Sequence, residues 1–125
     1  MKTLLQDIVG KENVQDEPQI LSSYSSDQSF VEPRMPQWVV FPQTTAQIQD
    51  LVKVGNQKKV ALIPYSSGLN LHGAAIPDQG GIIVNMSHMN RVLEEDERNW
   101  WAVIEPGVTY SQLENTLAPL GLRAM

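Results

Sequence analysis

The 125-residue sequence has no cysteine, few basic residues and no long hydrophobic run. Without cysteine there is no disulfide, iron–sulfur cluster, thiolate zinc site or cysteine nucleophile. Nine basic and 14 acidic side chains give a net charge of −5, which disfavours nucleic acid and anionic membrane surfaces as partners. The longest hydrophobic run, Trp100–Ile104, is far shorter than the ~20 residues of a membrane span, and no targeting segment is visible. We therefore expect a cytoplasmic protein with no nucleic-acid partner.

Hydrophobic residues make up 42% of the chain, enough for a packed core. Helical spacing predicts one short helix before Gly10 and a second from about Asp16. Residues 25–37 are predicted to be an extended connection. Three apolar runs are typical of strands buried on both faces: 38–41, 60–63 and 81–85. Two further helices are each predicted to open with a capping box, Thr44–Gln47 and Thr109–Gln112. After the third strand and before the second capping box, two shorter strands are predicted at 91–95 and 100–105. The acidic residues 94–97 are predicted to lie at the solvated turn between them.

The order strand, helix, strand implies a parallel β-α-β unit with a right-handed crossover. The predicted fold class is α/β (α+β), with a small mixed sheet and flanking helices. We divide the chain into N-terminal helices with an extended connection, residues 1–37, and a sheet-forming part, residues 38–125. The sequence ends just after a predicted helix, where a buried strand would be expected, so we expect a domain truncated at its C-terminus.

The stretch Ile63–Ala75 follows a buried strand and is rich in small and polar residues. Consecutive N–H groups in such a loop form a nest that binds anions, and serine hydroxyls and the Asn70 amide add donors. No lysine or arginine lies in it, so a phosphate would be held by neutral dipoles. Neither a Walker loop nor the Gly-x-Gly-x-x-Gly fingerprint is present. On these residues alone, a plain surface connection remains the more common alternative to a phosphate site.

The sequence also resembles a known family, the FAD-binding domain of the vanillyl-alcohol oxidase and p-cresol methylhydroxylase superfamily. That superfamily includes FAD-linked D-lactate dehydrogenases and the glycolate oxidase FAD subunit. The resemblance spans roughly residues 12–122. Five segments carry it in the family's order: Tyr24–Asp27, Val39–Ile48, Pro64–Gly73, Gly81–Glu94 and Ala102–Leu113. It implies the first lobe of an FAD-binding domain over residues 38–125, with the 64–73 segment at the pyrophosphate loop.

Two departures from the family concern this loop. Glycolate- and lactate-type relatives often have Arg-Gly-Gly-Gly where this chain has Tyr65–Gly68, which weakens a transfer of 2-hydroxy-acid specificity. Some relatives link the flavin covalently to a histidine at the position that corresponds to Leu69, so we expect no covalent link through this loop.

The resemblance implies which residues contact FAD. The cofactor-binding residues expected are Ser66, Ser67, Gly68, Leu69, Asn70 and Gly73, with secondary contacts from Pro42 and Ser87. Pro106 and Gly107 could line the cofactor, and a plain turn is the equal alternative for them. His72 and His88 could be ligands, but a packed or solvated structural role is favoured for each. We predict no catalytic residue and no metal ligand in the chain.

The resemblance implies the FAD-binding portion of a flavin-dependent oxidoreductase. The enzyme would oxidise a hydroxylated carbon, in a 2-hydroxy acid or an aryl alcohol or alkylphenol, with hydride transfer to flavin N5, and the isolated chain would be inactive. The alternative is a non-catalytic nucleotide- or partner-binding module on the same scaffold. The expected partners are FAD, the C-terminal lobe and substrate domain of the same protein, and a second copy in a homodimer.

Overall fold

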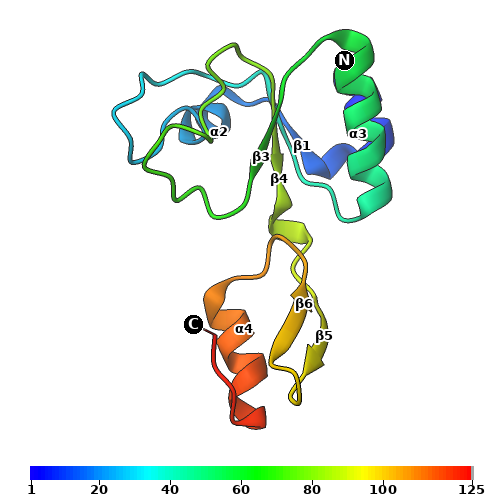
Figure 1. Cartoon of the computed structure of the whole chain (residues 1–125). Coiled ribbons are helices and arrows are strands. Elements are labelled where there is room, and N and C mark those ends of the chain that lie inside the picture. The colour runs from blue at the N-terminus through cyan, green and yellow to red at the C-terminus, as the bar shows by residue number, and fades with distance from the viewer. Residues whose placement is uncertain (125) are drawn as a thin grey trace.

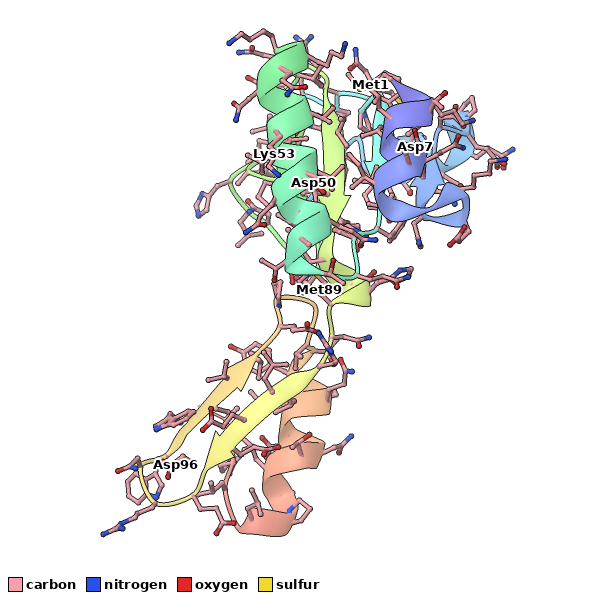
Figure 2. The ribbon with its side chains drawn as sticks, turned by 90° about the vertical axis from the view of Figure 1, so that its right-hand side faces the viewer. Met1, Asp7, Asp50, Lys53, Met89 and Asp96 are labelled. Carbon is pink, nitrogen blue, oxygen red and sulfur yellow. The ribbon has the colours of Figure 1, made fainter. Side chains whose placement is uncertain are left out.

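The computed structural model describes residues 1–124, which form two parts joined near Met89 (Figures 1 and 2). The first part holds a four-stranded sheet with helices, and the second holds a hairpin with one helix. The four α-helices are α1 (Lys2–Val9), α2 (Pro18–Ser23), α3 (Thr45–Lys58) and α4 (Tyr110–Leu117). The strands are β1 (Val14–Gln15), β2 (Trp38–Val40), β3 (Leu62–Tyr65), β4 (Ile82–Asn85), β5 (Val92–Asp96) and β6 (Trp101–Ile104). Short 3-10 turns occupy Lys11–Asn13, Met86–His88 and Ala118–Leu120.

The four-stranded sheet has the order β1-β2-β4-β3. β2 and β3 both run parallel to β4, and β1 pairs antiparallel with β2. The predicted parallel β-α-β unit is confirmed, although β4 lies between β2 and β3. The mixed α/β fold is confirmed with it. Because β1 belongs to the N-terminal segment, the first 37 residues contribute an edge strand to the sheet; the proposed division at residue 37 stays a prediction.

Alternate residues of the strands pack into two cores, one on each face of the sheet. Val40, Ile82 and Val84 face α1 and α3. Val39, Ile63 and Ile83 face the other side, where α2 and the long loops lie (Figure 1). All four residues of β4 are buried. This two-sided burial is what the uninterrupted apolar runs predicted.

The two predicted helix starts are present with different cap geometries. At α3 the Thr44 hydroxyl accepts from the Gln47 N–H at 3.2 Å, while the Gln47 side chain accepts from the N–H of Gln43, one residue before the cap. At α4 the reciprocal capping box of Thr109 and Gln112 is complete. Each satisfies N–H groups that have no partner within the helix.

Strand β3 lies two residues later than the 60–63 prediction. Lys59 ends α3 in the left-handed region at φ 55°, and the Val60 N–H donates to the Gly55 carbonyl, so the chain is still leaving the helix at Val60. Pro64 was expected to stop the strand but lies within it, in register with Val84. β3 is an edge strand, where the missing proline N–H costs no ladder hydrogen bond.

The β5–β6 hairpin also differs from the prediction at its turn. Trp100 was expected in a strand, but it lies in the turn with φ 60° and is 80% exposed. The Asp96 carboxylate accepts from the N–H groups of Arg98 and Asn99, which shapes the turn. Trp101, the first residue of β6, is also exposed. Neither tryptophan of the hairpin is therefore a core residue in the part of the chain that the structure describes.

An ion pair between an exposed arginine and a buried glutamate anchors the hairpin where it meets the first part. Glu105 is 7% exposed and receives the Arg91 guanidinium at 2.7 Å and the Arg91 N–H at 2.8 Å. These hydrogen bonds hold the pKa of Glu105 below its ordinary value. The pair fixes the chain directly before the Pro106–Gly107 turn.

None of the helices formed by residues 1–124 combines the length and the apolar character needed to cross a membrane.

Candidate functional site

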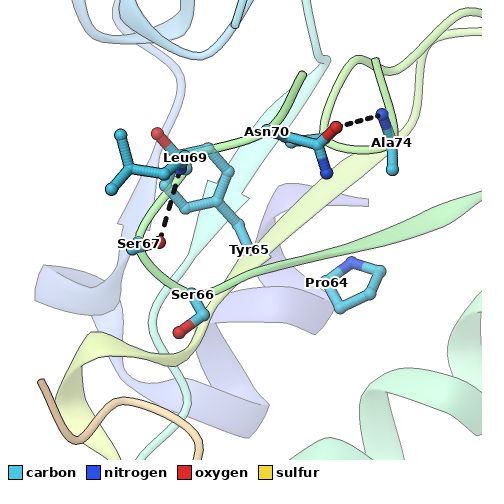
Figure 3. A pocket seen from close by; sticks show the side chains of 9 residues that line it. Pro64, Tyr65, Ser66, Ser67, Leu69, Asn70 and Ala74 are labelled. Atoms are coloured by element: carbon cyan, nitrogen blue, oxygen red, sulfur yellow. Dashed lines mark hydrogen bonds between the residues drawn. The ribbon is translucent and has the colours of Figure 1, made fainter. Parts of the chain in front are cut away.

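A hollow of about 230 Å³ lies where β3 runs into its long following loop (Figure 3). It is smaller than the roughly 300–1,000 Å³ of a pocket that encloses a whole small molecule, so it suits one group of a larger ligand. The lining comes from one continuous segment and two later residues: Pro64, Tyr65, Ser66, Ser67, Gly68, Leu69, Asn70, Ala74 and Ala75.

The 66–75 loop is shaped by its own polar side chains. The Asn70 carboxamide oxygen accepts from the His72 N–H at 2.8 Å. It also accepts from the Ala74 N–H at 3.3 Å, as Figure 3 shows. The Ser67 hydroxyl accepts from the Leu69 N–H at 3.3 Å. These local bonds replace the ladder that the backbone leaves at Tyr65. As a result, several amides of the loop are already occupied.

Two consecutive amides of the 66–75 loop are unoccupied. Within residues 1–124, no hydrogen bond uses the N–H of Ser67 or of Gly68. Gly68 has φ +73°, in the left-handed region, and loops that pass through this region can form concave nests of N–H groups that bind anions. No lysine or arginine lies in the loop. The donors are therefore neutral dipoles that suit an anionic group such as pyrophosphate.

The ring of Tyr65 supports the loop at Gly68. A Cβ on Gly68 would overlap the Tyr65 hydroxyl. Tyr65 packs edge-on against Tyr24 with ring centroids 4.9 Å apart, and the Tyr24 hydroxyl accepts from the buried Asn85 amide at 3.0 Å. Burial, and then the Tyr24 phenol, raise the pKa of Tyr65, so its hydroxyl keeps its proton at neutral pH. The end of β4 thus fixes the position of Gly68 through two tyrosines.

A second turn, Pro106–Gly107, contacts the 66–75 loop from a distant part of the sequence. The Ser66 hydroxyl donates to the Pro106 carbonyl oxygen at 2.7 Å, across forty positions of sequence. Gly107 follows, and its N–H donates to the Met89 carbonyl at 2.8 Å. A Cβ on Gly107 would overlap the carbonyl oxygen of Met86. This turn therefore needs glycine because backbone, and not a ligand, fills the space.

The structure brings most of the predicted cofactor-binding residues together. Five of the ten line the hollow: Ser66, Ser67, Gly68, Leu69 and Asn70. Gly73 lies in the same loop. Pro106 contacts the loop because its carbonyl accepts from the Ser66 hydroxyl, and Gly107 is the next residue of that turn. Two others lie apart from the hollow: Pro42 is less than 2% exposed, and Ser87 lies in the 3-10 turn after β4. The role of all ten in binding stays a prediction.

Neither histidine has a ligand-like setting. His88 packs against the Phe41 ring at a centroid distance of 5.2 Å, and His72 is exposed on the loop. Across residues 1–124 there is no group of three or more His, Asp or Glu side chains that could hold a metal ion.

Sequence reasoning missed Tyr65 as a residue of the site. Alternation offered a signal: Ile63 is buried, so Tyr65, two residues on, falls on the same face if the strand continues. The expected stop at Pro64 hid this continuation.

Comparison with known proteins agrees with the geometry. A family model described as "FAD binding domain" matches residues 36–125. The chain is 32% identical to the glycolate oxidase subunit GlcD of Bacillus subtilis (strain 168), over 98% of this chain and 26% of that protein. It is 31% identical to the flavoprotein subunit of 4-cresol dehydrogenase [hydroxylating] of Pseudomonas putida, over 94% of this chain and 23% of that protein.

A solved structure has the same fold. The crystal structure of p-cresol methylhydroxylase with substrate bound superposes with a TM-score of 0.86 at 30% identity, covering 97% of this chain and 24% of that one. The chain spans about a quarter of the length of the relatives it matches. A model matching 90 of 125 positions, a superposable structure and a loop whose free amides suit a pyrophosphate agree on one conclusion. The chain belongs to the FAD binding domain family, as part of the flavoprotein group that contains p-cresol methylhydroxylase, and its cofactor is FAD.

Proposed function

We propose that the 66–75 loop binds the pyrophosphate of FAD, and that the full-length protein is a flavin-dependent oxidoreductase. The observation that carries the proposal is the pair of free amides at Ser67 and Gly68, next to a glycine in the left-handed region. Neutral backbone amides in such a loop can bind phosphate oxygens without a lysine. The Ser66 and Ser67 hydroxyls and the Asn70 amide nitrogen are further donors at the same hollow.

The remaining predicted contacts are proposed to act beside this centre or as secondary contacts. Leu69 and Gly73 supply backbone beside the pyrophosphate, and Pro106 and Gly107 form the turn that Ser66 holds against the loop. Pro42 and Ser87 are proposed as secondary contacts at the ends of β2 and β4. FAD bound here would supply, at its N5, the acceptor for the hydride of a hydroxylated carbon. The residues of this chain bind and orient the cofactor for that step.

The proposed substrate is a 2-hydroxy acid or an alkylphenol or aryl alcohol. Similarity to a glycolate oxidase subunit supports the 2-hydroxy acid, and similarity to a 4-cresol dehydrogenase subunit supports the alkylphenol or aryl alcohol. Tyr65 stands where glycolate- and lactate-type relatives often have arginine. This difference weakens the case for a 2-hydroxy acid as the substrate.

A homodimer and a further C-terminal lobe are also proposed partners. The support is the apolar surface of the β5–β6 hairpin, where large side chains are exposed: Leu93, Trp100, Trp101, Val103 and Ile104. Sedimentation equilibrium of the full-length protein measures its oligomeric state. A cytoplasmic location stays a prediction from the sequence.

The experiment is anaerobic titration of purified full-length protein, followed by its visible absorption. We expect flavin bands, and their loss on addition of glycolate, D-lactate or 4-cresol, because the substrate reduces the bound flavin. A colourless protein that takes up no added FAD would favour the non-catalytic binding module.

A further inference from the structure

A second segment lies against the 66–75 loop, from a distant part of the sequence. Residues 25–34, here called the arc, leave α2 and curve beside the loop on the same side of the sheet (Figure 1). The Arg34 N–H donates to the Ser25 carbonyl at 2.8 Å and closes the arc at its base. The arc contains no helix or strand, so its position depends on these hydrogen bonds and on the loop it contacts.

Gln28 of the arc binds the backbone of Asn70 twice. Its N–H donates to the Asn70 carbonyl at 3.2 Å, and its side-chain oxygen accepts from the Asn70 N–H at 3.2 Å. Asn70 in turn holds the N–H groups of His72 and Ala74 with its own side chain. Fixing Asn70 therefore orders the loop on both sides of it. Gln28 is exposed and lines no part of the hollow.

The arc is itself held in shape next to the loop. Asp27 accepts from the Ser29 N–H at 2.8 Å, and its other carboxylate oxygen is shielded from solvent and has no partner in residues 1–124. Hydrogen bonding by Ser29 holds the pKa of Asp27 below its ordinary value, so it stays charged. Gly73 leaves room for Val31, because a Cβ there would overlap that side chain. The arc and the loop are thus packed at two places, Asn70 and Gly73.

We propose that Gln28 is a positioning residue for FAD: it holds the 66–75 loop in its binding shape before the cofactor arrives. This inference rests on the proposed function of that loop. A loop ordered in advance loses less conformational freedom on binding, so affinity rises although Gln28 never touches the ligand. Without the Gln28 side chain, the Asn70 N–H has no partner and the loop samples other shapes.

The test compares Gln28→Met with Gln28→Glu in full-length protein stripped of flavin. Methionine keeps the length of the side chain and removes the acceptor, whereas glutamate keeps an acceptor oxygen. For Gln28→Met we expect faster hydrogen exchange at Asn70, His72 and Ala74, and FAD binding weaker by about 2- to 12-fold, which is the loss of one hydrogen bond. For Gln28→Glu we expect exchange as in the wild type. FAD titrations are made at about 1 M salt, where the added charge is screened beyond ~3 Å.

Gln57→Met, on the exposed surface of α3, is the matched control and should change neither readout. Unchanged exchange at Asn70 in Gln28→Met, or FAD affinity equal to the wild type, would overturn the proposal. Equal losses in Gln28→Met and Gln28→Glu, with a lower Tm in both, would show a general structural role and overturn it too. The proposed function of the loop has its own test, and it fails if Gly68→Val keeps its flavin. The two failures can be told apart because the hydrogen-exchange measurement on Gln28→Met is made without FAD.

Discussion

Replacing Gly68 with valine is expected to remove most of the FAD from the full-length protein while leaving it folded. Gly68 has φ +73°, which strains a β-branched residue by ~1–3 kcal/mol, and the new side chain would overlap the Tyr65 hydroxyl. The loop or the supporting Tyr65 ring must shift to admit it, which displaces the two free amides. The measurement is the flavin-to-protein ratio after gel filtration, with circular dichroism to confirm folding.

Gly121→Val is the matched control for Gly68→Val. Gly121 has φ +70°, almost the same strain, but no atom of residues 1–124 lies within 4 Å of a Cβ there. We expect Gly121→Val to keep its flavin. Ser67→Ala should be milder than Gly68→Val, because it loses a single hydroxyl worth ~0.5–1.5 kcal/mol. Wild-type flavin content in Gly68→Val would remove the loop from the FAD site.

Replacing Gly107 with alanine is expected to destabilise the joint between the two parts of the structure. Its Cβ would overlap the Met86 carbonyl oxygen and crowd that of Met89, and backbone cannot rotate away as a side chain can. Overpacking of this kind costs ~1–3 kcal/mol in the free energy of unfolding. Urea denaturation of the full-length protein measures it.

Gly55→Ala is the control for the Gly107 prediction. Gly55 is buried, and its Cβ would meet the Leu62 side chain at 3.1 Å and the Val60 carbonyl oxygen at 3.2 Å. Both are tight contacts and not overlaps, the Leu62 side chain can shift, and alanine favours the helix by about 1 kcal/mol. We expect Gly55→Ala to be near neutral. A Gly107→Ala protein as stable as the wild type would mean that the Pro106–Gly107 turn moves freely and does not brace the loop.

Local signals in the sequence predicted most of the elements that carry the site. Uninterrupted apolar runs predicted β2 and β4, because strands buried on both faces need no alternation. Thr44 and Thr109 predicted the starts of α3 and α4 to the residue, because the hydroxyl and the N–H it binds are three residues apart. The end of β3 was missed, because whether Pro64 stops a strand depends on whether that strand lies at the edge of the sheet.

The long-range contacts of the site could not be predicted. Gln28 and Asn70 are forty-two positions apart, and Ser66 and Pro106 forty, so no spacing rule connects them. The same holds for Asn85, which fixes Tyr24 and through it Tyr65. The resemblance to a family located the pyrophosphate loop, but which of its amides are free follows only from the folded geometry.

The central claim is that the amides of Ser67 and Gly68 bind the pyrophosphate of FAD. Its most direct test is residue-resolved hydrogen exchange of the full-length protein, alone and with FAD, ADP or riboflavin. The account predicts that both amides exchange fast in the flavin-free protein and become protected with FAD and with ADP, which share the pyrophosphate, but not with riboflavin, which lacks it. Unprotected amides at Ser67 and Gly68 in a protein saturated with FAD would contradict it.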